Sequence, residues 1–188
     1  MDATSASFYL LEHVSDRGRD ALERREVCGK KSEDFQRMKP YFKGLVKLLA
    51  SFYYVGYLPW MPGTWGSLVA LPIAWFFNEN LAWFILILSL TGFLISPFAE
   101  AAFGAKDPSR FVLDEVVGMA LSVLWLPKNL ILYAVGFILF RGLDVWKPGP
   151  IGWIQKTETP SSILWDDLLA GAVANIILQA VVRLLVLR

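Results

Sequence analysis

The chain has 188 residues, a formal net charge of +1 and 55% hydrophobic residues, among them 8 tryptophans and 13 phenylalanines. A mean hydropathy of +0.46 is high for a soluble protein and favours a membrane-associated helical protein. The near-zero charge gives no indication of a nucleic-acid partner. The only histidine and the only cysteine, His13 and Cys28, lie in a charged N-terminal stretch, so histidine and thiolate chemistry are excluded from the apolar body.

Residues 1–40 differ in composition from the rest of the chain. They are dense in charges of both signs and are expected to form an arm that is helical or disordered, ahead of a functional domain over 41–188. No signal peptide is expected, because the first residues lack a basic stretch followed by an apolar one. Ten lysines and arginines lie between Arg17 and Lys47, and this excess predicts that the arm is cytoplasmic.

The apolar segments that follow predict an all-α domain. A helix over about 67–77 has Thr64 or Ser67 as its expected N-cap. Only Leu81–Ala99 and Leu168–Leu187 approach the ~20 residues that cross the hydrocarbon of a bilayer. The shorter segments fit buried core helices or re-entrant hairpins. The predicted segments are 44–58, 67–77, 81–99, 116–126, 130–140 and 167–187.

If each polar turn reverses the chain, these segments form a small membrane-embedded bundle of short helical hairpins, with the polar motifs gathered at one end. Nine acids follow residue 47, and six of them are predicted to collect at this end. Acids at the mouth of an apolar segment are costly to desolvate unless they are paired, hydrated or bound to metal, which indicates a functional role. The six are Asp107, Asp114, Glu115, Asp144, Asp166 and Asp167.

Each motif also has an interpretation that involves no function. Asp114 with Glu115 would favourably occupy a first helical turn, and Asp166 with Asp167 would cap a helix. Arg141, Asp144 and Lys147 recur every three residues and would share one face of a salt-bridged helix end. Thr64 belongs to a glycine-containing run, Met61–Ser67, which is either an ordinary capped turn or a helix start that binds phosphate.

Carboxylates that gather without histidine or cysteine fit a hard divalent cation such as Mg²⁺, which takes oxygen ligands and shares its coordination sphere with phosphate. Arg141 and Lys147 supply the positive charge that phosphate oxygens require. The sequence contains no Cys-x5-Arg motif, no Asp-x-Asp nucleophile motif and no Walker A motif. The phosphatase chemistry that remains is metal-assisted.

With these motifs assembled, the sequence resembles the phosphatidylglycerophosphatase A family. The resemblance covers roughly residues 44–188 and implies a small helical membrane protein that hydrolyses phosphatidylglycerophosphate to phosphatidylglycerol and inorganic phosphate with Mg²⁺. Residues 1–40 lie outside the family pattern, and Thr159–Ser162 replaces a loop that is usually glycine-rich. The matching pieces occur in the family's order and are Pro62–Leu68, Asp107–Gly118, Phe140–Ile151 and Asp166–Gly171.

The sequence therefore predicts a Mg²⁺-dependent lipid phosphomonoesterase of phospholipid biosynthesis, acting on an anionic phospholipid at the cytoplasmic face of the inner membrane. Two alternatives stay open: a non-enzymatic carrier or channel with a carboxylate-lined cation path, and a soluble helical bundle. The residues expected to bind metal or activate water are Asp114, Glu115, Asp166 and Asp167, with Asp107 and Asp144 as further metal ligands and Thr64, Arg141 and Lys147 as substrate contacts.

Overall fold

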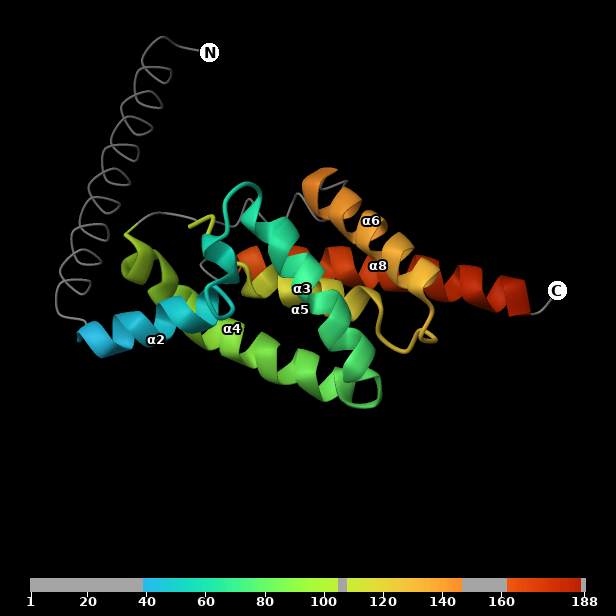
Figure 1. Cartoon of the computed structure of the whole chain (residues 1–188), viewed down its shortest axis with the longest axis horizontal. Coiled ribbons are helices and arrows are strands. Elements are labelled where there is room, and N and C mark those ends of the chain that lie inside the picture. The colour runs from blue at the N-terminus through green and yellow to red at the C-terminus, as the bar shows by residue number, and fades with distance from the viewer. Residues whose placement is uncertain (1–38, 105–107, 147–161, 187–188) are drawn as a thin grey trace, which may run out of the picture. The chain divides into compact units, whose positions relative to one another are not determined.

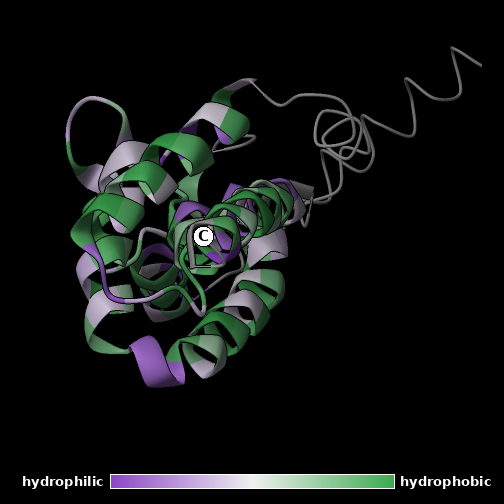
Figure 2. Ribbon diagram, turned by 90° about the vertical axis from the view of Figure 1, so that its right-hand side faces the viewer, coloured by the Kyte–Doolittle hydropathy of each residue, from purple (hydrophilic) through white to green (hydrophobic). Residues whose placement is uncertain are grey.

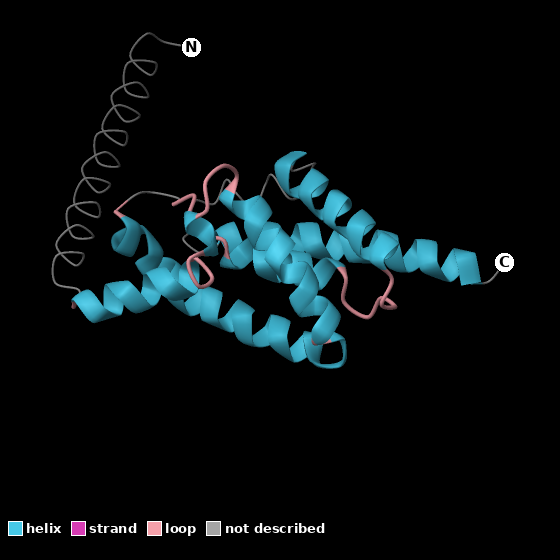
Figure 3. Ribbon diagram, in the orientation of Figure 1, coloured by secondary structure: helices cyan, strands magenta, loops and turns pink. Residues whose placement is uncertain are grey.

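A computed structural model of the chain describes residues 39–104, 108–146 and 162–186. This part of the chain is all-helical, as the sequence predicts, and contains no strand (Figure 3). The charged arm, apart from its last two residues, lies outside the described residues. The elements are α2 (Pro40–Ala50), η1 (Val55–Tyr57), α3 (Pro62–Phe76), η2 (Asn78–Asn80), α4 (Leu81–Phe103), α5 (Leu113–Ser122), α6 (Leu130–Trp146) and α8 (Ser162–Val186).

The short helix α5 is the core of the domain. It packs against α8, α3, α4 and α6 (Figure 1). Its residues Val116, Val117, Met119 and Ala120 have no exposed surface. A helix that contacts neighbours all round needs no polar face, which explains its nearly unbroken apolar sequence. Of the two interpretations of the short segments, a buried core helix describes the packing of α5.

Glycines bring α5 and α8 into backbone contact. A Cβ atom added to Gly171 of α8 would lie 2.3 Å from the carbonyl oxygen of Gly118 in α5. A Cβ added to Gly118 would lie 2.6 Å from the carbonyl oxygen of Asp167. Helices cross this closely only where small residues face one another. The two glycines therefore hold α5 close to the turn of α8 that carries Asp166 and Asp167.

Side-chain amides of α8 satisfy the carbonyl groups at the end of α5. The Nδ2 group of Asn175 donates to the carbonyl oxygens of Ser122 and Leu124 at 3.1 and 2.8 Å, and the Nε2 group of Gln179 donates to that of Leu124 at 3.2 Å. The last carbonyls of a helix have no partner within the helix. The two amides thus allow α5 to end inside an apolar bundle.

Two helices are long and apolar enough to cross a membrane, by length and composition: Asn78–Phe103, which includes α4, and Leu164–Leu184 within α8. At 1.5 Å per residue, α4 is about 34 Å long and α8 about 37 Å. Figure 2 shows that the helices are hydrophobic along most of their length. Large apolar side chains point outward, including Leu94 at 72% exposure and Ile176 at 67%, as expected where lipid covers the surface.

Helix α3 begins five residues earlier than the sequence predicts. Its first residue is Pro62, after Met61 at the N-cap, because proline already holds the helical φ angle and needs no amide partner. The predicted N-caps are wrong, since Thr64 and Ser67 both lie inside the helix. The hydroxyl of Ser67 instead donates to the carbonyl oxygen of Gly63 at 2.9 Å.

Candidate active site

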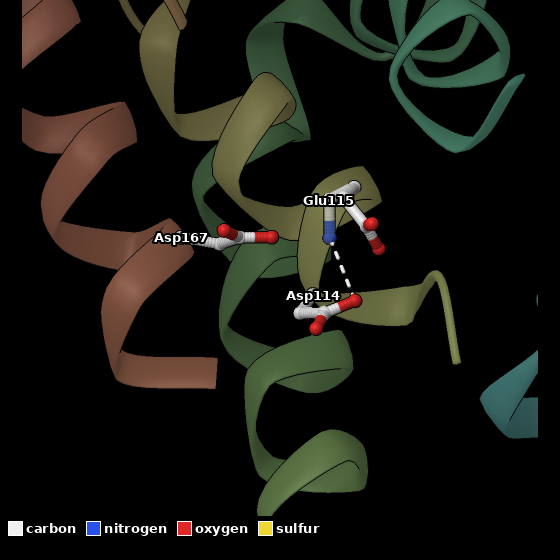
Figure 4. Close-up of side chains that lie close together, drawn as sticks. All are labelled: Asp114, Glu115 and Asp167. Carbon is white, nitrogen blue, oxygen red and sulfur yellow. Dashed lines mark hydrogen bonds between the residues drawn. The ribbon is translucent and has the colours of Figure 1, made fainter. Parts of the chain in front are cut away.

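Three carboxylates from two helices meet at the start of α5. Asp114 and Glu115 occupy the first turn of α5, and Asp167 comes from α8 (Figure 4). One carboxylate oxygen from each lies within 4.8 Å of the others. Asp114 and Asp167 are each only 4% exposed, and Glu115 is half-buried. We call these three residues the carboxylate cluster.

Helix α3 closes over one side of the carboxylate cluster. A Cβ added to Gly63, the second residue of α3, would lie 2.1 Å from the Oε1 atom of Glu115. Only a glycine leaves room for the carboxylate here. The N-terminal end of a helix also carries partial positive charge, so α3 both admits and stabilises the Glu115 carboxylate.

Two acids of the cluster, Asp114 and Glu115, have pKa values above those of ordinary carboxyls. Burial raises the pKa of Asp114 well above its usual value, and the neighbouring Glu115 adds to the rise. Burial also raises the pKa of Glu115 to about 7, with the charges of Asp167 and Asp144 contributing. Like charges that are crowded in a desolvated site favour the protonated forms unless a cation offsets them.

The cluster fits a divalent cation on two observations. The Oε2 atom of Glu115 is buried without a hydrogen-bond partner, and a buried carboxylate oxygen is costly unless it is paired or coordinated. The available donors are oxygens only, from three converging carboxylates, which is the donor set that Mg²⁺ prefers. Asp114, Glu115 and Asp167 are therefore the described residues that could hold the metal.

The basic motif of α6 forms an ion pair next to the cluster. The Nη1 group of Arg141 donates to the Oδ2 atom of Asp144 at 2.5 Å. Helix α6 continues through Trp146, so Asp144 lies in its last turn, where a carboxylate requires a cation nearby. Arg141 supplies that cation. Because the charge of Asp144 also acts on Glu115, this ion pair belongs to the surroundings of the carboxylate cluster.

The other predicted site residues either lie outside the carboxylate cluster or are not among the described residues. Asp166 is buried at 2% exposure on α8 but does not join the three-carboxylate group. It is also not an N-cap, because α8 begins four residues before it, at Ser162. Thr64 is half-buried in the first turn of α3, beside Gly63. Asp107 and Lys147 lie outside the described residues.

Sequence reasoning missed the role of the glycines. Gly63, Gly118 and Gly171 all lie in the motifs that carry the resemblance, but their spacing gives no hint of which element each one admits. Gly63 makes room for a carboxylate, whereas Gly118 and Gly171 let two backbones touch. A glycine within a helix costs stability unless a close approach requires it, and that cost is the only signal in the sequence.

The fold and the site define a class: an all-helical protein with two apolar helices of membrane-spanning length and a cluster of three carboxylates that could hold a metal ion. Comparison with known proteins narrows this class. Residues 48–182 match the family model described as phosphatidylglycerophosphatase A. The chain belongs to the phosphatidylglycerophosphatase A family, and it is accordingly a phosphatase of lipid metabolism.

Three curated relatives illustrate the match. Phosphatidylglycerophosphatase A of Escherichia coli is 36% identical over 134 residues, which cover 68% of this chain and 77% of the relative. Phosphatidylglycerophosphatase A of Haemophilus influenzae is 33% identical over 72% of this chain and 88% of the relative. A Bacteroides thetaiotaomicron protein, provisionally named a phosphatidylinositol-3-phosphatase, is 35% identical over 68% and 87%. No solved structure matches the chain.

Proposed function

We propose that this protein removes the terminal phosphate of phosphatidylglycerophosphate, releasing phosphatidylglycerol and inorganic phosphate as a step of phospholipid biosynthesis. The observation that carries the proposal is the buried carboxylate cluster at the junction of α5 and α8, in a chain that aligns with two proteins named for this activity. A phosphomonoester is a dianion and needs concentrated positive charge to be held beside carboxylates. The site therefore requires both a cation and basic side chains.

We infer that Mg²⁺ meets the first requirement. Asp114, Glu115 and Asp167 would hold the ion, with Asp107, Asp144 and Asp166 as further ligands or as acids that orient the attacking water. When bound, the ion supplies polarisation of the phosphoryl oxygen and a lower pKa for water. Arg141 and Lys147 would bind the phosphate oxygens, since a guanidinium matches them with paired donors. Thr64, in the first turn of α3, would contact the same anion through its hydroxyl.

We further propose that the protein is inserted in the inner membrane with its site facing the cytoplasm. It is supported by the two apolar helices of sufficient length and by the excess of lysine and arginine before residue 48, because basic flanking segments stay on the cytoplasmic side. Resistance of the protein to a high-pH carbonate wash of membranes is the expected result. Its release by that wash would favour the alternative of a soluble bundle.

The name of one relative indicates a second candidate substrate. The Bacteroides relative is named for a phosphatidylinositol phosphate, in which the monoester sits on inositol instead of glycerol. Both lipids carry a phosphodiester next to the diacylglycerol and a phosphomonoester beyond it. The carboxylate cluster would bind the phosphomonoester, which the two lipids share. The cluster by itself therefore does not favour glycerol over inositol as the alcohol.

Phosphate release by purified protein in detergent tests the proposal directly. With Mg²⁺ present, we expect turnover of phosphatidylglycerophosphate to exceed that of phosphatidylinositol 3-phosphate, because two of the three relatives are named for the first lipid. We expect EDTA to abolish this turnover and excess Mg²⁺ to restore it. Full turnover in chelator would refute the metal-dependent mechanism. Metal binding by a well-folded protein that turns over neither lipid would favour the carrier alternative.

A further inference from the structure

A basic and aromatic surface lies near the carboxylate cluster, and none of its residues has a role in the reaction proposed above. The guanidinium carbon of Arg110 lies 4.7 Å from the centre of the Tyr57 ring. The Tyr57 ring lies 6.4 Å from that of Phe103, and the Nζ atom of Lys47 lies 6.0 Å from the Phe103 ring. We call these four residues the basic–aromatic patch. It joins α2, η1, the end of α4 and the segment before α5.

The charge of Arg110 is available to a ligand. Arg110 is exposed, and among the described residues it forms no ion pair with a carboxylate. Its stacking partner is an aromatic ring, which covers one face of the guanidinium and leaves the N–H groups along its edge uncommitted. A guanidinium held in this way is preorganised for the paired oxygens of a phosphate group.

The backbone fixes Arg110 relative to the carboxylate cluster. A Cβ added to Gly56 in η1 would lie 2.2 Å from the carbonyl oxygen of Arg110, so the two backbones are in contact. The amide of Val112 donates to the carbonyl oxygen of Ala50 at 3.0 Å. Asp114 follows Arg110 by four residues, a stretch of at most about 14 Å even when fully extended. The α-carbons of Arg110 and Asp114 therefore lie no farther apart than this, and the side chain of Arg110 extends from a backbone held close to the start of α5.

The proposed substrate contains a second phosphate close to the one that is hydrolysed. In phosphatidylglycerophosphate, one glycerol unit separates the phosphomonoester, which is hydrolysed, from the phosphodiester on the diacylglycerol side. The geometry points to the basic–aromatic patch as a binding subsite for this phosphodiester, with Arg110 as the principal contact, Tyr57 as its support and Lys47 as a second cation. This inference rests on the proposed function, since it takes the monoester to bind at the carboxylate cluster.

Two inhibitors separate the subsites. Dihexanoyl phosphatidylglycerol carries the diester without the monoester, and glycerol 3-phosphate carries the monoester without the diester. For Arg110→Ala we expect the inhibition constant of dihexanoyl phosphatidylglycerol to rise about tenfold or more, as for the loss of a charged hydrogen bond, whereas that of glycerol 3-phosphate stays within about twofold. Arg110→Lys should recover part of the loss, and Tyr57→Phe, which keeps the ring, should resemble the wild type.

Arg183→Ala is the matched control, because Arg183 is an exposed arginine near the far end of α8 and should change neither constant. Equal changes for both inhibitors in Arg110→Ala would overturn the subsite, as would no change for either. The short-chain lipid is used below its micellar concentration, so an effect seen only with anionic vesicles would mean that Arg110 binds the bilayer surface, and would also overturn the inference.

The test also distinguishes failure of the subsite from failure of the proposed function. If wild-type protein releases no phosphate from phosphatidylglycerophosphate, the proposed function is wrong. Calorimetric titration of wild-type protein and Arg110→Ala with dihexanoyl phosphatidylglycerol still decides the subsite, because it requires no turnover. Tighter binding by the wild type supports the subsite, and equal affinity overturns it.

Discussion

Replacement of Gly63 by alanine should separate catalytic geometry from stability. The added Cβ would lie 2.1 Å from the Oε1 atom of Glu115, and ordinary contact begins at 3.4 Å, so the carboxylate oxygen must retreat by about 1.3 Å (3.4 minus 2.1). The displaced atom is the end of a flexible side chain. Its retreat costs little folding free energy, and alanine in a helix recovers up to about 1 kcal/mol relative to glycine.

The effect on catalysis should be large, because a misplacement of about 1 Å at a reacting centre can reduce the rate about 10²-fold. We therefore expect Gly63→Ala to lose about two orders of magnitude in kcat while its thermal unfolding temperature changes little. Phosphate release and thermal unfolding in detergent are the two measurements. Gly44→Ala in α2 is the control, since a Cβ there would meet no atom within 4 Å.

A double variant tests the cause. Glu115→Asp shortens the side chain and withdraws the carboxylate from Gly63, so the two substitutions should not be additive: Gly63→Ala should cost much less in the Glu115→Asp background than in the wild type. If Gly63→Ala keeps more than half of the wild-type activity, the position of the Glu115 carboxylate does not matter for the reaction, and the proposed site is wrong at this residue.

Four further predictions concern the carboxylate cluster and the packing of α5 against α8. Asp167→Asn should stay folded but react about 10²–10³-fold more slowly, because it removes one preorganised electrostatic contact. The control variant Glu79→Gln, in η2, should remain active. Wild-type turnover in Asp167→Asn would argue against the carboxylate cluster as the active site. Gly171→Ala should destabilise the fold by about 1–3 kcal/mol through overpacking, because its Cβ would meet backbone; an unchanged unfolding temperature would contradict the close crossing of α5 and α8. Asn175→Leu should cost about 1–3 kcal/mol by leaving the carbonyls at the end of α5 unpaired, measured by the same unfolding assay, and an unaffected stability would mean that water or another group satisfies them. In chelator, the unfolding temperature should fall as the pH rises from about 4.5 to 7, because the raised pKa of Glu115 makes the folded state retain a proton that the unfolded state has lost. Adding Mg²⁺, or replacing Glu115 by glutamine, should weaken this pH dependence. A rise in the unfolding temperature over the same pH range would contradict the prediction.

Much of the architecture follows from the sequence alone. Long uncharged runs bounded by polar turns predict helices, and α4 covers the predicted run Leu81–Ala99. Helix α8 covers most of the predicted run Leu168–Leu187 but begins at Ser162, five residues before the predicted start at 167. The boundaries were less predictable. Helix α4 continues through Pro97 to Phe103, and α3 begins at Pro62, because the stopping power of proline depends on whether the surrounding packing supports the next turn.

The sequence also determined which residue types any site must use, since an apolar body without histidine or cysteine leaves carboxylates, hydroxyls and basic groups. It did not determine which acids meet. Asp166 and Asp167 are adjacent in the chain, and their side chains leave a helix in different directions; only the crossing at Gly118 and Gly171 turns Asp167 toward α5. The pairing of Arg110 with Tyr57 likewise depends on backbone contact between distant segments. Composition and periodicity act along the chain, whereas these contacts depend on how closely two backbones approach, which only the packed structure decides.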